Sequence, residues 1–386
     1  MAARAALVLT GGGARAAYQV GVLAAISEIL PDKKRCPFPI ICGTSAGAIN
    51  AAYLATRTAH FALGVAELRS LWRSFHAGDV YRADAPGMAA AALSWLGAMA
   101  GGWLVRRSPR SLLDSTPLHR LLERHIDFAQ IAAAIQDGRL HSLSITCSGY
   151  ASGQSVSFFQ GRPDLDPWQR AQRLGAHAKL GLEHLLASSA IPFIFPAVKI
   201  NREYFGDGSM RQVAPISPAI HLGADRILVI GAGRQATAES VRVPDGDYPS
   251  LAKIAGHALS SIFLDSMWAD LERIRRINKT LTLIPEAVKK EQGTQLRPID
   301  VLVIAPSQRL DHLAAQHAAS LPWPVRAMLG GIGAMNKDGG ALTSYLLFER
   351  PYTRALIQLG RKDTLARRQE VLEFLDPGHQ ITFAST

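Results

Sequence analysis

The sequence contains few cysteines and few charged residues. Its three cysteines, Cys36, Cys42 and Cys147, are odd in number and lack metal-type spacing, which argues against a disulfide framework and a cysteine-rich metal site. We therefore expect a reducing, cytoplasmic setting, with Cys42 and Cys147 as buried thiols. Charged residues make up 19% of the chain and apolar residues 48%, which excludes an intrinsically disordered protein and predicts a large hydrophobic core.

Long apolar runs are also scarce. The run over residues 5–9 is too short for the core of a signal peptide and predicts a first β-strand instead. Residues 86–105 carry no charge over 20 positions, a length that spans a bilayer. They are mostly small residues, rich in alanine and glycine, which contribute little transfer energy. We therefore expect a buried or lid helix, or an interfacial element that dips into lipid, rather than a membrane span.

Acidic residues are in deficit, because 31 Asp and Glu against 42 Lys and Arg leave a net charge of +11. A basic protein favours anionic partners, either nucleic acid or a membrane rich in acidic lipids. The basic residues form short groups, as at 33–35, 106–107, 273–276 and 367–368, which are typical of solvated helix faces. We therefore expect peripheral contact with an anionic membrane surface, and no nucleic acid partner.

Predicted strands and helices alternate along much of the chain. This alternation predicts an α/β fold with a mostly parallel central sheet and helices on both faces. We expect a main domain over residues 1–305 and a helical C-terminal extension over 306–386 packed on it. Strands are expected at 5–9, 39–42, 142–148, 154–159, 198–205, 226–230 and 298–304, and helices at 14–30, 45–56, 167–187 and 248–278, with further helices before 136 and after 308.

The strongest chemical pattern is a G-x-S-x-G that follows the second predicted strand and opens a helix. A serine in this strand–turn–helix context projects its hydroxyl from a sharp turn, and only small residues fit around it. The N-terminus of the following helix favours a developing negative charge. The pattern predicts Ser45 as a nucleophile, within an elbow formed by Gly43, Thr44, Ser45, Ala46 and Gly47.

A glycine-rich turn directly follows the first predicted strand. Glycines leave backbone N–H groups unobstructed, and such groups can form an oxyanion hole. The same turn also fits the G-x-G-x-x-A pattern of dinucleotide-binding proteins, with Glu28 or Asp32 near the expected ribose-binding acid. A plain structural turn is the third interpretation, and the residues alone leave all three open. The residues concerned are Gly11, Gly12, Gly13, Arg15 and Ala16.

A third pattern, an aspartate between glycines, follows the strand predicted at 198–205. Alone it indicates a common turn, but the three patterns in this order resemble the patatin-like phospholipase family. The family's G-G-G-x-R/K motif matches Gly11, Gly12, Gly13 and Arg15, its G-x-S-x-G motif matches 43–47, and its Asp-Gly motif matches Asp207 and Gly208. Segments 187–196 and 225–230 also look like the stretches around that aspartate. Ser209 and Ala16 depart from the family pattern, although both are small.

The resemblance implies a serine lipid acyl hydrolase of the phospholipase A or lysophospholipase type. Asp207 would take the proton of Ser45 directly, and burial would raise its pKa for that task. The resemblance implies an acyl lipid or phospholipid substrate and neither cofactor nor metal. An inactive lipid-binding relative and, less favoured, a dinucleotide-binding oxidoreductase remain as alternatives. Within the enzyme class, His221 follows Asp207 in the chain order of a Ser-Asp-His triad.

Overall fold

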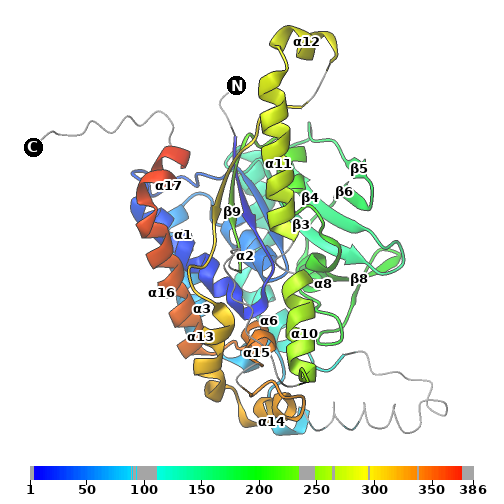
Figure 1. Ribbon diagram of the computed structural model, residues 1–386, viewed down its shortest axis with the longest axis vertical. Helices are drawn as coiled ribbons and strands as arrows, with labels where there is room; N and C mark the ends of the chain where they lie inside the picture. The colour runs from blue at the N-terminus through cyan, green and yellow to red at the C-terminus, as the bar shows by residue number, and fades with distance from the viewer. Residues whose placement is uncertain are drawn as a thin grey trace, which may run out of the picture.

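The computed structural model describes residues 4–87, 89, 93, 111–233, 248–262, 266–293, 296–336 and 339–375. Within them, ten strands form one sheet in the order β10-β9-β1-β2-β3-β4-β6-β5, with β8 also pairing with β3 and β7 pairing with β8 (Figure 1). The strands are β1 (Ala5–Leu9), β2 (Ile40–Thr44), β3 (Ser142–Gly149), β4 (Ser155–Gly161), β5 (Trp168–Arg170), β6 (Arg173–His177), β7 (Val198–Ile200), β8 (Glu203–Asp207), β9 (Arg226–Ile230) and β10 (Asp300–Ile304).

Helices surround this sheet. They are α1 (Ala17–Ile29), α2 (Ala46–Ala55), α3 (Phe61–Ser74), α4 (Ala77–Val80), α6 (Thr116–His125), α7 (Phe128–Gln136), α8 (Leu182–Ser188), α9 (Ser217–His221), α10 (Leu251–Ser260), α11 (Ser266–Leu283), α12 (Glu286–Glu291), α13 (Leu310–His317), α14 (Trp323–Gly331), α15 (Gly340–Leu346), α16 (Arg350–Ala366) and α17 (Arg368–Leu375). Short 3-10 turns are η1 (Gly13–Ala16), η2 (Gly208–Arg211) and η4 (Ala318–Ser320). One follows β1 and another follows β8, so each lies beside a predicted motif.

The centre of the sheet is parallel. Strands β10, β9, β1, β2 and β3 run parallel to one another, whereas the pairs β3–β4, β3–β8, β5–β6 and β7–β8 are antiparallel. All residues of β1 and β2 are buried, because helices cover both faces of the sheet. The predicted α/β fold with a mostly parallel central sheet is therefore confirmed.

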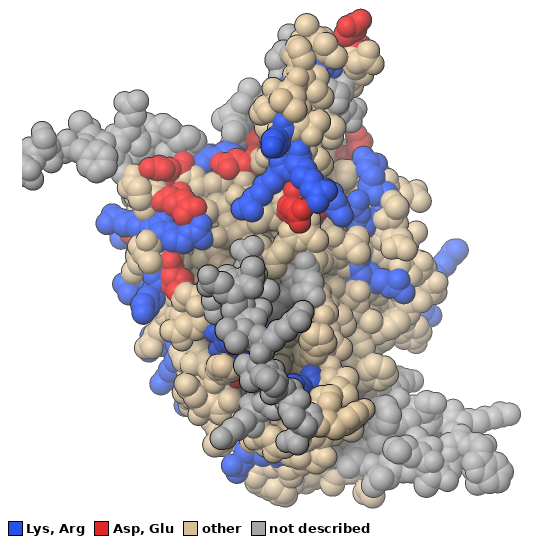
Figure 2. Space-filling model, in the orientation of Figure 1, with Lys and Arg blue, Asp and Glu red and all other residues tan. Residues whose placement is uncertain are grey.

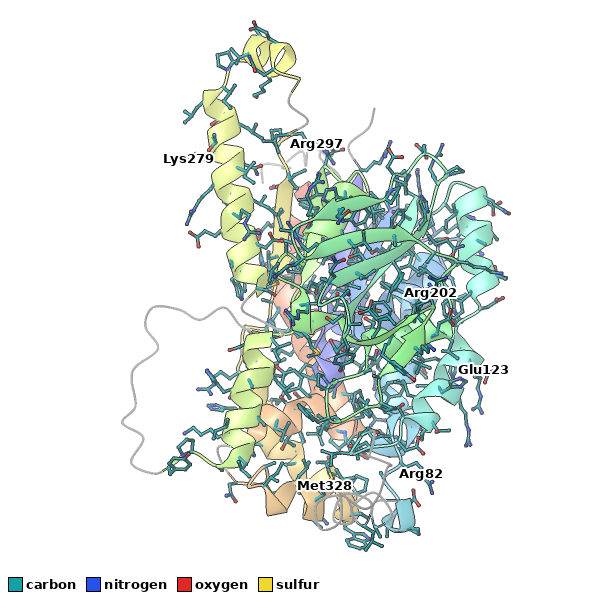
Figure 3. All side chains as sticks on the ribbon, turned by 90° about the vertical axis from the view of Figure 1, so that its right-hand side faces the viewer. Arg82, Glu123, Arg202, Lys279, Arg297 and Met328 are labelled. Carbon is teal, nitrogen blue, oxygen red and sulfur yellow. The ribbon has the colours of Figure 1, made fainter. Side chains whose placement is uncertain are left out.

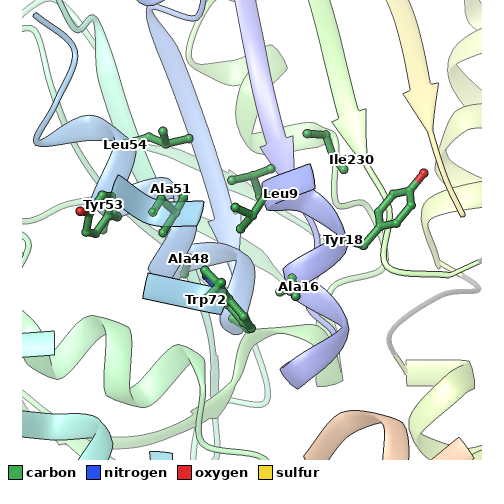
Figure 4. Close-up of a cluster of buried hydrophobic side chains, with 14 of the residues drawn as sticks. Leu9, Ala16, Tyr18, Ala48, Ala51, Tyr53, Leu54, Trp72 and Ile230 are labelled. Carbon is green, nitrogen blue, oxygen red and sulfur yellow. The ribbon is translucent and has the colours of Figure 1, made fainter. Parts of the chain in front are cut away.

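Successive residues of β1 pack into two separate cores. Leu7 and Leu9 belong to the larger core, which includes residues of α1 and α2; Figure 4 shows Leu9 among side chains from these helices. Ala6 and Val8 face the smaller core on the other side, formed with residues of α9 and α11. This two-residue alternation is the normal consequence of the strand pleat, and it gives the sheet two covered faces.

One predicted helix is wrong. The structure replaces most of the helix expected over 167–187 with the β5–β6 hairpin and keeps only α8 at its end. The ring of Trp168 stacks on Phe159 at a centroid distance of 5.1 Å and lies so close to Gly175 that a Cβ there would come within 2.2 Å of it. Gln172 takes a positive φ of 58° at the turn. Tertiary packing of the tryptophan thus overrides the local helix propensity.

Two further predicted helices lie only partly within the described residues. Helices α10 (Leu251–Ser260) and α11 (Ser266–Leu283) cover most of the helix expected over 248–278, and residues 263–265 between them lie outside the described residues. The apolar segment 86–105 lies outside the described residues except at four positions, so its predicted role as a lid or interfacial helix stays a prediction. In the part of the chain that is described, no helix is long and apolar enough to cross a bilayer.

Basic side chains gather on α11. Figure 2 shows Lys and Arg residues over this helix, and Figure 3 places Lys279 on its projecting part. Arg273 and Arg276 pair with Asp270 and Glu272 of the same helix, at 3.3 and 2.6 Å. The Arg276–Glu272 pair is exposed and contributes only about 0.3–0.5 kcal/mol, whereas Asp270 is buried and also accepts a hydrogen bond from the Ile216 N–H. Helix α11 therefore has the solvated basic face that the sequence predicted for residues 273–276.

Helix α16, from the C-terminal part of the chain, lies alongside α1 (Figure 1). Two glycines permit the close approach: a Cβ on Gly21 would lie 2.1 Å from the carbonyl oxygen of Ile357, and one on Gly360 2.2 Å from that of Tyr18. Arg361 adds an ion pair with Glu28 at 2.8 Å. Helix α16 thus packs closely on α1, and the division into a domain over 1–305 and a packed C-terminal extension stays a prediction.

We expect Gly360→Ala to destabilise the protein by about 1–3 kcal/mol, because the added methyl forces α16 away from α1. Urea unfolding measures the change. Gly331→Ala is the matched control, since it also lies in a helix but has open space around its Cβ position. The control should leave stability unchanged or raise it slightly. Equal behaviour of the two variants would contradict the proposed close packing.

Candidate active site

Ser45 lies at the turn between β2 and α2 in a strained backbone conformation. Its φ of 56° and ψ of −132° are sparsely populated by residues other than glycine and cost about 1–3 kcal/mol. The flanking glycines are sterically required: a Cβ on Gly43 would lie 2.5 Å from the Cα of Ala48, and one on Gly47 2.3 Å from the carbonyl oxygen of Leu9. The predicted strand–turn–helix context of the serine is therefore present.

The structure brings Ser45 and Asp207 together. The Ser45 hydroxyl donates to Asp207 Oδ2 at 2.6 Å, and both side chains are almost completely buried. Strand register explains the meeting, because Thr44 pairs with Thr146 in β3 and the adjacent Cys147 pairs with Asp207 in β8. Two residues 162 positions apart thus become neighbours across three strands.

The environment of Asp207 alters its acidity. Burial raises the pKa of this carboxyl to about 6, against the opposing effects of hydrogen bonds from the Ser45 hydroxyl and the Ser209 N–H. The Ser209 N–H donates to Oδ1 at 2.9 Å, which leaves Oδ2 for the serine. Gly208 is required beside them, since a Cβ there would lie 2.0 Å from the Thr146 carbonyl oxygen. The carboxylate is a stronger base than an exposed aspartate and is still largely ionised at neutral pH.

Ser188, at the end of α8, is a residue that the sequence patterns did not single out. Its Oγ accepts a hydrogen bond from the Ser45 N–H at 2.8 Å and donates one to the Thr146 carbonyl oxygen at 2.6 Å. These two bonds tie the strained turn to β3. The segment 187–196 was part of the family resemblance, but nothing in the pattern distinguished Ser188 from Ser189.

The glycine turn lies beside the serine. Gly13 borders the same cavity as Ser45, and no described residue accepts a hydrogen bond from the N–H of Gly12 or Gly13. Gly13 also needs to be glycine, because its φ is 55° and a Cβ would lie 2.3 Å from the Tyr345 carbonyl oxygen. Gly11 is buried next to them. The turn therefore offers two free N–H donors near the nucleophile, as an oxyanion hole requires.

Arg15 lies away from the exposed surface. It is 4% exposed, and its Nε donates to the Ser344 hydroxyl at 2.8 Å. These contacts fit a role in orienting the loop rather than in contacting a phosphate. The acids required by the dinucleotide interpretation are engaged elsewhere, since Glu28 pairs with Arg361 and Asp32 caps the backbone at Lys34.

An apolar cavity of about 30 Å³ adjoins Ser45. A cavity of that size holds roughly one or two water molecules, so a longer chain enters only if its side chains move apart. Ser189 contributes a buried hydroxyl with no hydrogen-bond partner in the described structure. The cavity is lined by Gly13, Ser45, Ala46, Ile49, Trp72, Phe75, Val80, Leu118, Leu121, Ser189, Ile191, Phe195 and Phe348.

The structure gives the histidine alternative no support. His221 stacks on Trp168 at a centroid distance of 4.9 Å, and burial together with nearby arginines lowers its pKa to about 4. Among the described residues, the hydrogen bonds of Ser45 and Asp207 involve no histidine. The same described part holds no cluster of three or more His, Cys, Asp and Glu residues suited to a metal ion.

Comparisons with known proteins give one family match and two structural matches. A family model described as patatin-like phospholipase matches residues 7–220, more than half of the chain. Two solved structures also match the chain. VipD from Legionella pneumophila has 11% identity and a TM-score of 0.32, over 92% of this chain and 66% of that one. Human GIVD cytosolic phospholipase A2, in complex with methyl gamma-linolenyl fluorophosphonate, has 13% identity and a TM-score of 0.43, over 97% and 58%.

The chain thus spans about three fifths to two thirds of the length of these two structures. No curated protein matches the sequence.

Replacement of the buried aspartate should stabilise the protein at neutral pH. Because the pKa of Asp207 is raised in the folded state, its contribution to stability is full below about pH 4 and is lost as the pH rises through about 6. We therefore expect Asp207→Asn to be more stable than the wild type at pH 8, by on the order of 2 kcal/mol, with the difference vanishing near pH 4.

Urea unfolding at the two pH values measures this difference. Asp164→Asn serves as the control of opposite sign, since hydrogen bonding from Arg162 lowers the pKa of that exposed carboxyl. This variant should gain no stability at pH 8. A loss of stability in Asp207→Asn at pH 8 would show that burial does not dominate the environment of Asp207.

Proposed function

This chain belongs to the patatin-like phospholipase family, and we propose that it is a serine lipid acyl hydrolase of the phospholipase A or lysophospholipase type. The observation that carries the proposal is the 2.6 Å hydrogen bond from Ser45 to Asp207, beside a glycine turn and an apolar cavity. A nucleophile, a base, two free N–H donors and a space for an apolar group are the parts that acyl transfer needs.

The proposed reaction begins when Ser45 Oγ attacks the carbonyl carbon of an ester. Asp207 Oδ2 accepts the hydroxyl proton, and the carbonyl oxygen becomes an oxyanion that the N–H groups of the glycine turn stabilise. The intermediate collapses to an acyl-serine, and the leaving alcohol takes the proton from Asp207. A water molecule then gives its proton to Asp207 and attacks the acyl group, which releases a fatty acid and returns the proton to Ser45.

In the proposed mechanism, the burial of Asp207 lets this carboxylate act as the base without a histidine. A carboxylate with an ordinary pKa is a weak base. The raised pKa of Asp207 reduces the difference in pKa between this carboxyl and the serine hydroxyl, which makes proton transfer easier. The short bond to Ser45 also orients the hydroxyl before substrate arrives. These properties support a direct Ser–Asp pair as the proton-transfer system.

The substrate class follows from the cavity and the charge. The lining is apolar apart from two serines, which suits an acyl chain, and the net charge of +11 favours a peripheral approach to anionic lipid. We also propose that residues 1–305 form the hydrolase domain and that the helices after it are an extension packed on it. The packing of α16 on α1 supports this arrangement.

Substitution of either partner should abolish esterase activity. We expect Ser45→Ala and Asp207→Asn to lower kcat/KM on p-nitrophenyl acyl esters by at least about a thousandfold, because nucleophile and base act as a unit. A fluorophosphonate should label the wild type on Ser45 and leave Ser45→Ala unlabelled.

Ser189→Ala is the matched control, since its hydroxyl borders the same cavity and has no hydrogen-bond partner in the described structure. It should retain nearly wild-type activity. Full activity in Ser45→Ala, or loss in a correctly folded His221→Ala variant, would refute the proposed Ser–Asp pair.

A larger side chain in the cavity should shorten the acyl chain that the enzyme accepts. Leu121→Trp fills space beside Ser45, so kcat/KM for esters of twelve carbons should fall by about tenfold or more, while that for four carbons changes little. Leu63→Trp, at an exposed position of α3, is the control and should preserve the wild-type profile. An unchanged profile in Leu121→Trp would place the acyl chain elsewhere.

A further inference from the structure

The guanidinium of Arg15 is held by a helix that lies outside the family-matched residues 7–220. Its Nε donates to the Ser344 hydroxyl at 2.8 Å and its Nη2 reaches the Ala341 carbonyl oxygen at 3.5 Å. The group also lies over the ring of Tyr345, 4.1 Å from the centroid. All three contacts belong to α15, and no described carboxylate pairs with this arginine.

Burial without a carboxylate is unusual for an arginine. A long charged side chain near a surface normally extends its head group into water while its stem covers apolar surface. Arg15 instead turns inward and is 4% exposed, so a hydroxyl, a carbonyl oxygen and an aromatic face replace water around its charge. This arrangement defines one orientation for the arginine, because each contact fixes a different part of the guanidinium.

Helix α15 also touches the glycine turn directly. A Cβ on Gly13 would lie only 2.3 Å from the Tyr345 carbonyl oxygen, so the backbone of α15 is in close contact with the turn. Gly13 and Arg15 both belong to η1. Helix α15 therefore contacts this turn at two points, the backbone of Gly13 and the side chain of Arg15. A shift of α15 would therefore change the direction of the N–H groups of the turn.

Helix α15 is itself firmly anchored. The Thr343 hydroxyl donates to the Ala334 carbonyl oxygen at 3.0 Å, and the Tyr81 hydroxyl donates to that of Leu346 at 2.9 Å. A Cβ on Gly340 would lie 2.5 Å from the Asp311 carbonyl oxygen, so the helix is also in close contact with α13. The two chain positions that follow include Phe348, which lines the cavity beside Ser45.

From these contacts we propose that Ser344 and Tyr345 are positioning residues, which act through Arg15 to hold the glycine turn in the geometry that stabilises the oxyanion. The inference rests on the proposed function, because it assigns the turn to the oxyanion. It makes the C-terminal part of the chain a component of the active site. Errors of a fraction of an ångström in such donors weaken transition-state stabilisation while ground-state binding is largely kept.

The test measures kcat and KM separately on a short p-nitrophenyl ester. Ser344→Ala and Tyr345→Leu should each lower kcat by roughly tenfold and leave KM within about twofold, a smaller loss than the hundredfold or more for a missing oxyanion donor. Labelling by a fluorophosphonate should slow by a similar factor, since the phosphonyl oxygen uses the same donors.

Matched variants separate positioning from general destabilisation. Thr364→Val removes a buried hydroxyl of α16 whose one hydrogen bond within the described residues goes to the Gly360 carbonyl oxygen, and it should lower the melting temperature without changing kcat. Tyr345→Phe keeps the aromatic face under Arg15 and should retain kcat, in contrast to Tyr345→Leu. The comparison of Tyr345→Phe with Tyr345→Leu keeps the test decisive even where Ser344→Ala fails to fold.

A double-mutant cycle tests whether Ser344 acts through Arg15. In an Arg15→Met background, Ser344→Ala should cause no further loss of kcat, because the contact that it removes is already absent. Unchanged kcat in both Ser344→Ala and Tyr345→Leu, or a full additional loss in the double variant, would overturn the proposal. Activity retained in Ser45→Ala would instead refute the proposed function, so the two failures are distinguishable.

Discussion

The register of three neighbouring strands is the constraint on which the candidate site depends. Thr44 of β2 is paired with Thr146 of β3, and the next residue of β3 is paired with Asp207 of β8. A slip of one residue in either pair would turn the aspartate to the other face of the sheet and separate it from Ser45. The packed cores on both faces make such a slip costly, so the fold itself maintains the 2.6 Å contact.

The site combines several features that are individually unfavourable. Ser45 has a positive φ, Asp207 is a fully buried carboxylate, and Arg15 is a buried cation. Each is offset by specific neighbours: Ser188 ties down the strained turn, Ser209 donates to the carboxylate, and α15 surrounds the guanidinium. These stabilising neighbours belong to α8, η2 and α15, so the small site depends on elements that lie far apart in the sequence.

The sequence predicted the parts of the fold that have local signals. The first and ninth strands coincide with the expected ranges 5–9 and 226–230, because buried parallel strands are continuous apolar runs. The short glycine motifs also lie at the ends of strands, as their steric role requires. The hairpin of β5 and β6 was missed, since its formation depends on the stacking of Trp168. The contact of Arg15 with Ser344 joins residues 329 positions apart, and no local pattern encodes it. The catalytic roles themselves stay predictions.

The buried cysteines allow the opening of the core beside the site to be measured by thiol alkylation. Cys147 is fully buried opposite Asp207, and desolvation raises the pKa of its thiol well above the usual value. Cys36 and Cys42 are buried as well, and their thiol pKa values are raised for the same reason. Because only a solvent-accessible thiolate reacts rapidly with alkylating reagents, the folded chain is inert to them. The rate at which Cys147 is alkylated therefore reports how often the core between β3 and α8 opens to solvent, next to the strand that holds Asp207 against Ser45.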